Sequence, residues 1–137
     1  MAGYSGTPLS KKLGIKSGHR VAVVRPPEGF EKSLGELPED VTLQKGIAGK
    51  VPLDVILFFA GRRGEFEKHL SSLRGRMATA GGLWIAWPKK ASGVATDMNE
   101  NVVREVALPT GLVDNKVCAI DETWSGLRLV IRLVHRT

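Results

Sequence analysis

The sequence predicts an α/β protein built as a three-layer open sheet, mostly parallel, with an antiparallel hairpin at its C-terminal end. Three observations predict this class. Short apolar strands alternate with helical patterns through most of the chain, glycine and proline separate these segments, and the last two strands are joined by a connection of hairpin length. Because crossovers between parallel strands are right-handed, helices are expected on both faces of the sheet.

Apolar runs and turn residues together predict four helices and six strands. Helices are expected over residues 9–13, 28–34 and 65–77, and around Val102, Val103 and Val106. Strands are expected over residues 20–24, 41–43, 54–59, 83–87, 117–120 and 127–134.

The first helices and strands are bounded by residues with known backbone preferences. Thr7 is the expected N-cap of the first helix, Pro8 its first residue and Gly14 its left-handed stop. The prolines at 26–27 end the first strand, because neither can donate a hydrogen bond to a neighbouring strand. Gly35 closes the second helix, and the strand after it has the weakest pattern.

The middle of the chain carries the strongest patterns. The strand over residues 54–59 is apolar on both faces, as interior parallel strands are. The next helix has an apolar stripe at spacings of four, three and four, formed by Phe66, Leu70, Leu73 and Met77. Residues 80–82 are expected to break this helix before the next strand, which Pro88 ends. Asp97 and Glu100 resemble a capping box for the last helix.

Composition limits the classes of protein that this chain can represent. Its 137 residues are 42% hydrophobic and 25% charged, so one domain over residues 1–137 is expected, with residues 1–16 as an N-terminal arm and short helix. No apolar run approaches the roughly 18 residues of a membrane span. The single cysteine, Cys118, suits a reducing compartment, so a cytoplasmic protein is expected. The net charge of +6 favours acidic partners.

The order of the segments resembles the Rossmann-like core of class I methyltransferases. Residues 16–21 resemble the turn that leads into the family's first strand, and residues 53–57 resemble its fourth strand. Leu70, Leu73 and Arg76 resemble the helix that follows, and residues 81–83 resemble the start of the family's fifth strand. The closing hairpin resembles the family's sixth and seventh strands. The resemblance implies that one strand is missing before Asp54, and that the sheet order is second, first, third, fourth, sixth, fifth.

Two positions depart from the cofactor site of that family. The turn over residues 25–29 contains two prolines and one glycine, so two amide donors are lost where the backbone would approach a cofactor. Leu43 is followed by Gln44 and Lys45, where an acidic residue would bind ribose. We therefore expect no cofactor and a non-catalytic protein, with a diverged S-adenosylmethionine-dependent transferase as the alternative.

Three longer motifs resemble a family of small bacterial proteins of unknown function. They are Gly-Tyr-Ser-Gly-Thr-Pro-Leu at residues 3–9, Trp-Pro-Lys-Lys-Ala-Ser-Gly at residues 87–93, and Asp-Asn-Lys-Val-Cys at residues 114–118. This resemblance extends over nearly the whole chain and implies a bacterial, cytosolic setting.

Cationic side chains follow three of the predicted strands at the point where each strand ends. The predicted ligand-binding residues are Arg25, Arg62, Arg63, Lys89 and Lys90, with the hydroxyls of Ser92 and Thr96. Ligands of open parallel sheets bind beyond the carboxyl ends of the strands, so we expect these groups to converge there. The helix near Asp97 would point its amides at the same edge, and such a set suits a phosphate- or nucleotide-like anion. The alternative is that these are ordinary polar loop ends of a basic protein.

The C-terminal hairpin suggests a different partner. Trp124 is expected in its loop, over residues 121–126, where exposure would suit a homodimer contact or a protein partner. Arg128, Arg132 and Arg136 share one face of the last strand. A solvated outer face is the expected reading of these arginines, and nucleic-acid binding is the weaker one.

The remaining chemically distinctive residues are expected to be structural. Trp84 and Trp87 lie on opposite faces of one strand and are expected to fill the core. His69 flanks the apolar stripe of its helix as an interface residue, and Cys118 is expected to be a buried small hydrophobe. The sequence has no Cys/His metal cluster, Walker loop or paired carboxylates, so no metal is predicted.

Overall fold

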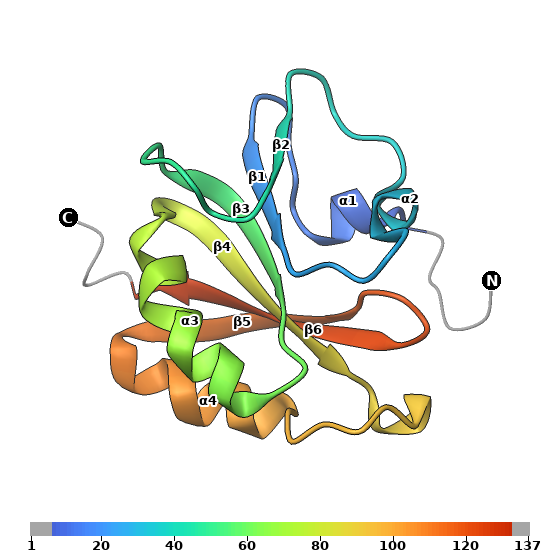
Figure 1. Cartoon of the computed structure of the whole chain (residues 1–137). Helices are drawn as coiled ribbons and strands as arrows, with labels where there is room; N and C mark the ends of the chain where they lie inside the picture. The colour runs from blue at the N-terminus through green and yellow to red at the C-terminus, as the bar shows by residue number, and fades with distance from the viewer. Residues whose placement is uncertain (1–6, 133–137) are drawn as a thin grey trace.

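Six strands form a single sheet in the computed structural model, which describes residues 7–132 (Figure 1). They are β1 Arg20–Val24, β2 Thr42–Lys45, β3 Leu53–Phe59, β4 Met77–Pro88, β5 Leu112–Ala119 and β6 Trp124–Ile131. Their order is β2-β1-β3-β4-β6-β5. The first four in this order are parallel, and β6 is antiparallel to both of its neighbours. The predicted sheet order and the antiparallel end are confirmed.

Helices cover both faces of this sheet, which confirms the three-layer arrangement. They are α1 Leu9–Lys12, α2 Phe30–Leu34, α3 Arg63–Gly75 and α4 Glu100–Ala107, with short 3-10 turns η1 Lys90–Ser92 and η2 Leu108–Thr110. Helices α3 and α4 lie together on one face, and α1 and α2 lie on the other (Figure 1). Residues 1–6 of the predicted arm and residues 133–137, which include Arg136, lie outside the described part of the chain.

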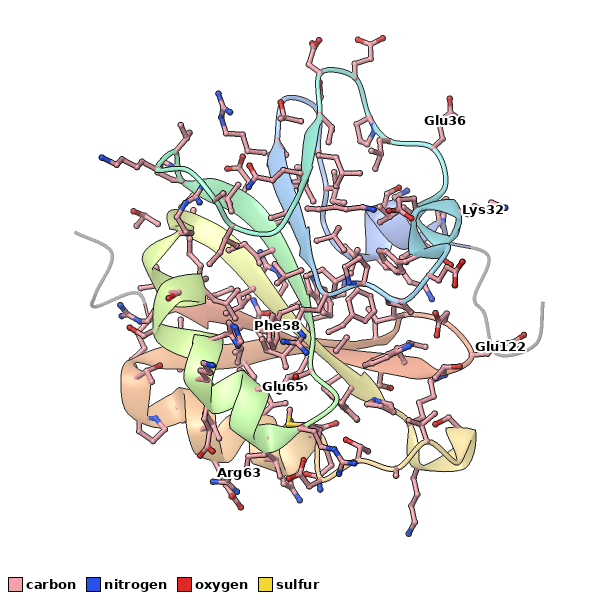
Figure 2. All side chains as sticks on the ribbon, viewed as in Figure 1. Lys32, Glu36, Phe58, Arg63, Glu65 and Glu122 are labelled. Carbon is pink, nitrogen blue, oxygen red and sulfur yellow. The ribbon has the colours of Figure 1, made fainter. Side chains whose placement is uncertain are left out.

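Strand β3 is buried on both sides, as its continuous apolar pattern predicts. Ile56 and Phe58 pack in the core beneath α3 and α4, whereas Val55, Leu57 and Phe59 pack in the core beneath α1 and α2. Figure 2 shows Phe58 in the interior, while labelled charged residues such as Lys32, Glu36 and Glu122 project outward. This parallel strand has helices on both faces, so all its residues after Asp54 are apolar and buried.

The two tryptophans of β4 enter opposite cores, which confirms their predicted role. Trp84 packs beneath α1 and α2, where its indole Nε1 donates a hydrogen bond to the Leu13 carbonyl at 3.0 Å. Trp87 packs in the core beneath α3 and α4. His69 is also an interface residue, because its Nδ1 lies 2.7 Å from the Glu65 carbonyl oxygen and its ring lies against Phe58.

The starts of the first two helices differ in detail from the prediction. Pro8, with ψ of 145°, is the N-cap of α1 and not its first residue, so Thr7 lies outside the helix. Helix α2 begins at Phe30 because Gly29 has a φ of 77°, a left-handed conformation that cannot belong to a right-handed helix. Gly14 and Gly35 do have the positive φ expected at helix ends.

The predicted break at residues 80–82 is wrong. Strand β4 begins at Met77, which the apolar stripe had assigned to α3, and α3 ends at Gly75. The pairing of β4 with β3 shifts register, so that Leu53 faces Met77 but Val55 faces Gly82. An added Cβ at Gly81 would lie 2.9 Å from two carbonyl oxygens of β3. These glycines therefore allow close backbone approach inside a continuous, bulged strand.

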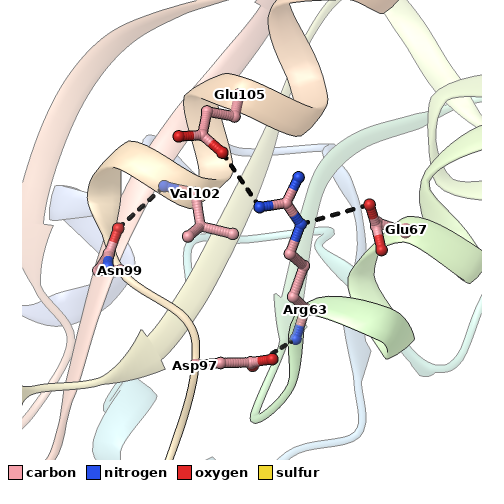
Figure 3. A network of polar contacts seen from close by, with 6 residues as sticks. All are labelled: Arg63, Glu67, Asp97, Asn99, Val102 and Glu105. Carbon is pink, nitrogen blue, oxygen red and sulfur yellow. Dashed lines mark hydrogen bonds and ion pairs between the residues drawn. The ribbon is translucent and has the colours of Figure 1, made fainter.

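Asp97 caps a different helix from the one predicted. The N-cap of α4 is Asn99, whose side-chain oxygen accepts a hydrogen bond from the Val102 amide at 2.9 Å. The Asp97 carboxylate instead accepts a hydrogen bond from the amide of Arg63, the first residue of α3, at 2.7 Å (Figure 3). Asn99 holds the N-cap position of α4 directly before Glu100, so the Asp97 side chain is free to satisfy the first amide of α3 from another part of the chain.

The terminal hairpin is longer, and its loop shorter, than predicted. Trp124 is the first residue of β6 and not part of the loop. It is half-buried, and its ring packs edge-to-face against Phe59 with 5.0 Å between centroids. Cys118 is half-buried and not fully buried, because β5 is the edge strand. A homodimer contact through this hairpin stays a prediction.

Helix length and apolarity also bear on membrane insertion. Among the helices of residues 7–132, none combines the length and the apolar character that crossing a bilayer requires.

Candidate ligand-binding site at the carboxyl edge of the sheet

A pocket of about 570 Å³ opens where β4 ends and the chain turns toward α4. Its lining residues are Trp87, Pro88, Lys90, Gly93, Val94, Ala95, Thr96, Met98 and Asn99. Trp87 and Met98 form an apolar floor and are only 7% and 3% exposed. Lys90, Thr96 and Asn99 supply the polar side chains. The pocket therefore combines a buried apolar surface with a few polar groups, as small-molecule sites do.

Hydroxyl groups hold the loop that forms this pocket. Ser92 Oγ donates to the Lys89 carbonyl at 2.6 Å and accepts from the Val94 amide at 3.2 Å. Thr96 Oγ1 donates to the Gly61 carbonyl at 2.6 Å and accepts from an amide two residues later at 3.0 Å. Both predicted hydroxyls are thus engaged with the backbone. Thr96 forms part of the pocket wall, and Ser92 shapes the loop behind it.

Two of the five predicted cations are neutralised within the protein. Arg25 follows β1 in a left-handed conformation, with φ of 59°, and its guanidinium forms an ion pair with Glu65 in the first turn of α3. Arg63 points away from the sheet edge, toward the space between α3 and α4. There its guanidinium contacts Glu105 at 3.0 Å and Glu67 at 3.3 Å (Figure 3). The pKa of Arg63 is raised above its ordinary value, mainly by the hydrogen bond to Glu67 and next by the one to Glu105.

The other three predicted cations remain at the edge. Arg62 is exposed at the N-cap of α3, and Lys89 and Lys90 follow β4 directly. None of the three side chains forms an ion pair with another residue in the range 7–132. The structure therefore does not gather all five cations at one point, and it places only Lys90 in the wall of the pocket.

Asn99 lines the pocket although the sequence analysis did not single it out. Its side-chain oxygen is used as the cap of α4, which orients the amide nitrogen of the same side chain as a donor. A polar residue directly before a helical pattern was the available signal. The sequence analysis assigned the cap of α4 to Asp97 because that residue, too, matches a capping pattern.

The ends of β1 and β2 do not fit the cofactor of class I methyltransferases, S-adenosylmethionine. Where that cofactor needs a close backbone approach, this chain has Arg25 followed by two prolines without amide hydrogens. At the end of β2, Lys45 Nζ lies 3.2 Å from Glu31 Oε1, where an acidic residue would bind ribose. A cationic side chain at each of these two strand ends is thus paired with a glutamate of the protein.

No protein-family model matches the chain, and no curated protein matches it. Solved structures do. A SAM-dependent methyltransferase from Aquifex aeolicus is 19% identical with a TM-score of 0.59, over 89% of this chain and 87% of that one. The DhpI-SAH complex is 11% identical with a TM-score of 0.63, over 91% and 82% of the two chains.

A third solved structure is similar over most of this chain. The magnesium protoporphyrin IX methyltransferase from Synechocystis, with bound SAH, is 12% identical with a TM-score of 0.56, over 85% of this chain and 75% of that one. At such identities a likeness establishes architecture and not activity. The chain therefore has the Rossmann-like fold of the class I SAM-dependent methyltransferases.

Proposed function

We propose that this protein binds an anionic small molecule, phosphate- or nucleotide-like, in the pocket at the end of β4. The observation that carries the proposal is the pairing of an apolar floor, formed by Trp87 and Met98, with the ammonium group of Lys90 and the side-chain amide of Asn99. An aromatic surface beside a cation suits a ligand with an apolar ring and a negatively charged group.

The surrounding charges support the same sign of ligand. Lys89 and Arg62 lie at the same edge of the sheet without ion pairs among the described residues, and they make the local potential more positive. The Asp97 carboxylate accepts a hydrogen bond from the first amide of α3 and does not line the pocket. The proposed site is thus smaller than the five-cation edge that the sequence predicts.

Isothermal titration calorimetry with ATP, AMP, ribose 5-phosphate and inorganic phosphate tests the proposal. Wild-type protein should bind at least one of them saturably, and Lys90→Ala should weaken that binding about tenfold, as expected for the loss of one charged contact. Lys50→Ala is the matched control, because Lys50 is an exposed lysine just before β3 begins and outside the pocket. Absence of binding to all four compounds would remove the proposal, and so would equal weakening in both variants.

A second candidate function is methyl transfer with S-adenosylmethionine. The structural comparisons support it more directly than they support anion binding, because two of the similar structures are methyltransferases and two are bound to SAH. The turn over residues 25–29 is the feature that opposes it. A thermal-shift assay with S-adenosylmethionine and S-adenosylhomocysteine decides between the two. Stabilisation by both, with none from the phosphate compounds, would favour the transferase.

A further inference from the structure

A second concave surface lies between α3 and α4, on the outer side of that helical layer. This groove has a volume of about 480 Å³ and is lined by Arg63, Glu67, Leu70, Ser71, Arg74, Glu105, Val106 and Thr110. Successive positions three and four residues apart on α3 form one wall, as one face of a helix does. Helix α4 and the η2 turn form the other wall. The groove is separate from the pocket at the end of β4, since the two share no lining residue.

The acidic residues of the groove are engaged at one end of it. Arg63, the first residue of α3, forms ion pairs with both Glu67 and Glu105, which are the two carboxylates in the lining (Figure 3). This three-residue network joins the start of α3 to the second half of α4, and it engages both acidic side chains of the lining.

Arg74 has a different environment in the last turn of α3. It lies eleven positions after Arg63, which corresponds to about 16 Å along a helix axis. Its Nε is covered by protein, yet no hydrogen-bond acceptor for it is found among the described residues. Within residues 7–132 its guanidinium also takes part in no ion pair. Because this Nε is covered, a ligand in the groove would bind the terminal nitrogens of the guanidinium, which are the donors left to it.

Arg76 provides an internal comparison. Its Nε is likewise covered and without an acceptor, but its terminal nitrogens donate to the backbone carbonyls of Ile47 and Val51. That guanidinium already has a structural use, as a clamp on the connection between β2 and β3. Arg74 has no such contact among the described residues, and it lies in the wall of a groove instead.

We infer that the Arg74 end of this groove binds a small organic monocarboxylate. The planar guanidinium matches a carboxylate in a paired hydrogen-bond geometry, and the Ser71 hydroxyl stands three residues before it on the same helix face. Leu70, which is buried, and Val106, which is half-buried, provide an apolar surface for the rest of the ligand.

A titration followed by ¹H–¹⁵N NMR spectra tests this inference with benzoate and butyrate as probes. Wild-type protein should show saturable shifts at the amides of Ser71, Arg74 and Thr110. Arg74→Gln should weaken binding by about 10- to 100-fold, since it removes a charge-assisted pair of hydrogen bonds. Lys68→Gln is the matched control, because Lys68 is an exposed cation on the same helix that does not line the groove.

A second variant keeps the test decisive if Arg74→Gln fails to fold. Ser71→Glu places a carboxylate three residues before Arg74, where it should pair with the guanidinium and abolish binding of the probe. Absence of saturable shifts in the wild type, or unchanged binding in either variant, would overturn the inference. Such a failure leaves the phosphate titrations of the β4 pocket untouched, because the two sites have separate residues and probes.

Discussion

Replacement of Gly81 by alanine should destabilise the protein by steric conflict alone. The added Cβ would lie 2.9 Å from the carbonyl oxygens of both Leu53 and Asp54, and 3.1 Å from that of Ala78. Ordinary carbon–oxygen contacts are about 3.3–3.6 Å, so the overlap is about half an ångström. The two closest oxygens belong to β3, which is paired on both sides and cannot easily move.

The expected size of this effect follows from two opposing contributions. Overpacking of a well-packed interior costs about 1–3 kcal/mol. Alanine also restricts the unfolded chain, which returns about 0.4–1 kcal/mol. Gly81→Ala should therefore lower the free energy of unfolding by about 1–2 kcal/mol. Urea unfolding followed by far-ultraviolet circular dichroism measures this change, provided that the denaturant dependence stays constant between variants.

Two other glycines provide graded controls. Gly75 ends α3 with nothing within 4 Å of an added Cβ, so Gly75→Ala should stabilise the protein by about 0.5–1 kcal/mol. At Gly82 the added Cβ would lie 2.4 Å from Nε of Arg128, a flexible side chain that can move aside. Gly82→Ala should thus cost less than Gly81→Ala. If Gly81→Ala proves as stable as Gly75→Ala, close backbone approach does not explain the glycine.

Three further predictions concern the core, the helix caps and pH. Trp84→Phe removes a buried hydrogen bond to the Leu13 carbonyl and should cost about 2–3 kcal/mol in urea unfolding; a loss below 1 kcal/mol would contradict this. Asp97→Ala and Asn99→Ala should each cost about 1 kcal/mol in the same assay, because each leaves a backbone amide at a helix start without its acceptor, and no loss in either variant would contradict this. Burial raises the pKa of the Cys118 thiol above its ordinary value of 9.0, so the folded state retains a proton that the unfolded state releases. Stability should therefore fall as the pH rises above about 9, and less steeply in Cys118→Ser, which unfolding at pH 8 and 10 would show.

The strand order and the layers could be predicted because they depend on local patterns and general rules of chain connection. The apolar run of β3 and the stripe at Phe66, Leu70 and Leu73 mark what is buried, whatever their neighbours are. The start of β4 could not be predicted in this way. Whether Gly81 breaks a strand or lets it approach β3 depends on where the carbonyl oxygens of β3 lie.

The candidate site could also be predicted only in part from the sequence. Its cations, and their position just after strands, follow from residue order and from the shared edge at which parallel strands end. Their charge partners do not, because Arg25 meets Glu65 and Arg63 meets Glu105 across about forty residues of chain.

Periodicity along the chain therefore determines the elements, their order and the faces they bury, since each depends on residues within a few turns or strands. The folded arrangement alone decides which carboxylate neutralises which guanidinium, and which helix a given Asp caps. Those contacts act only over a few ångströms, and distances of that kind exist only once the layers have packed together.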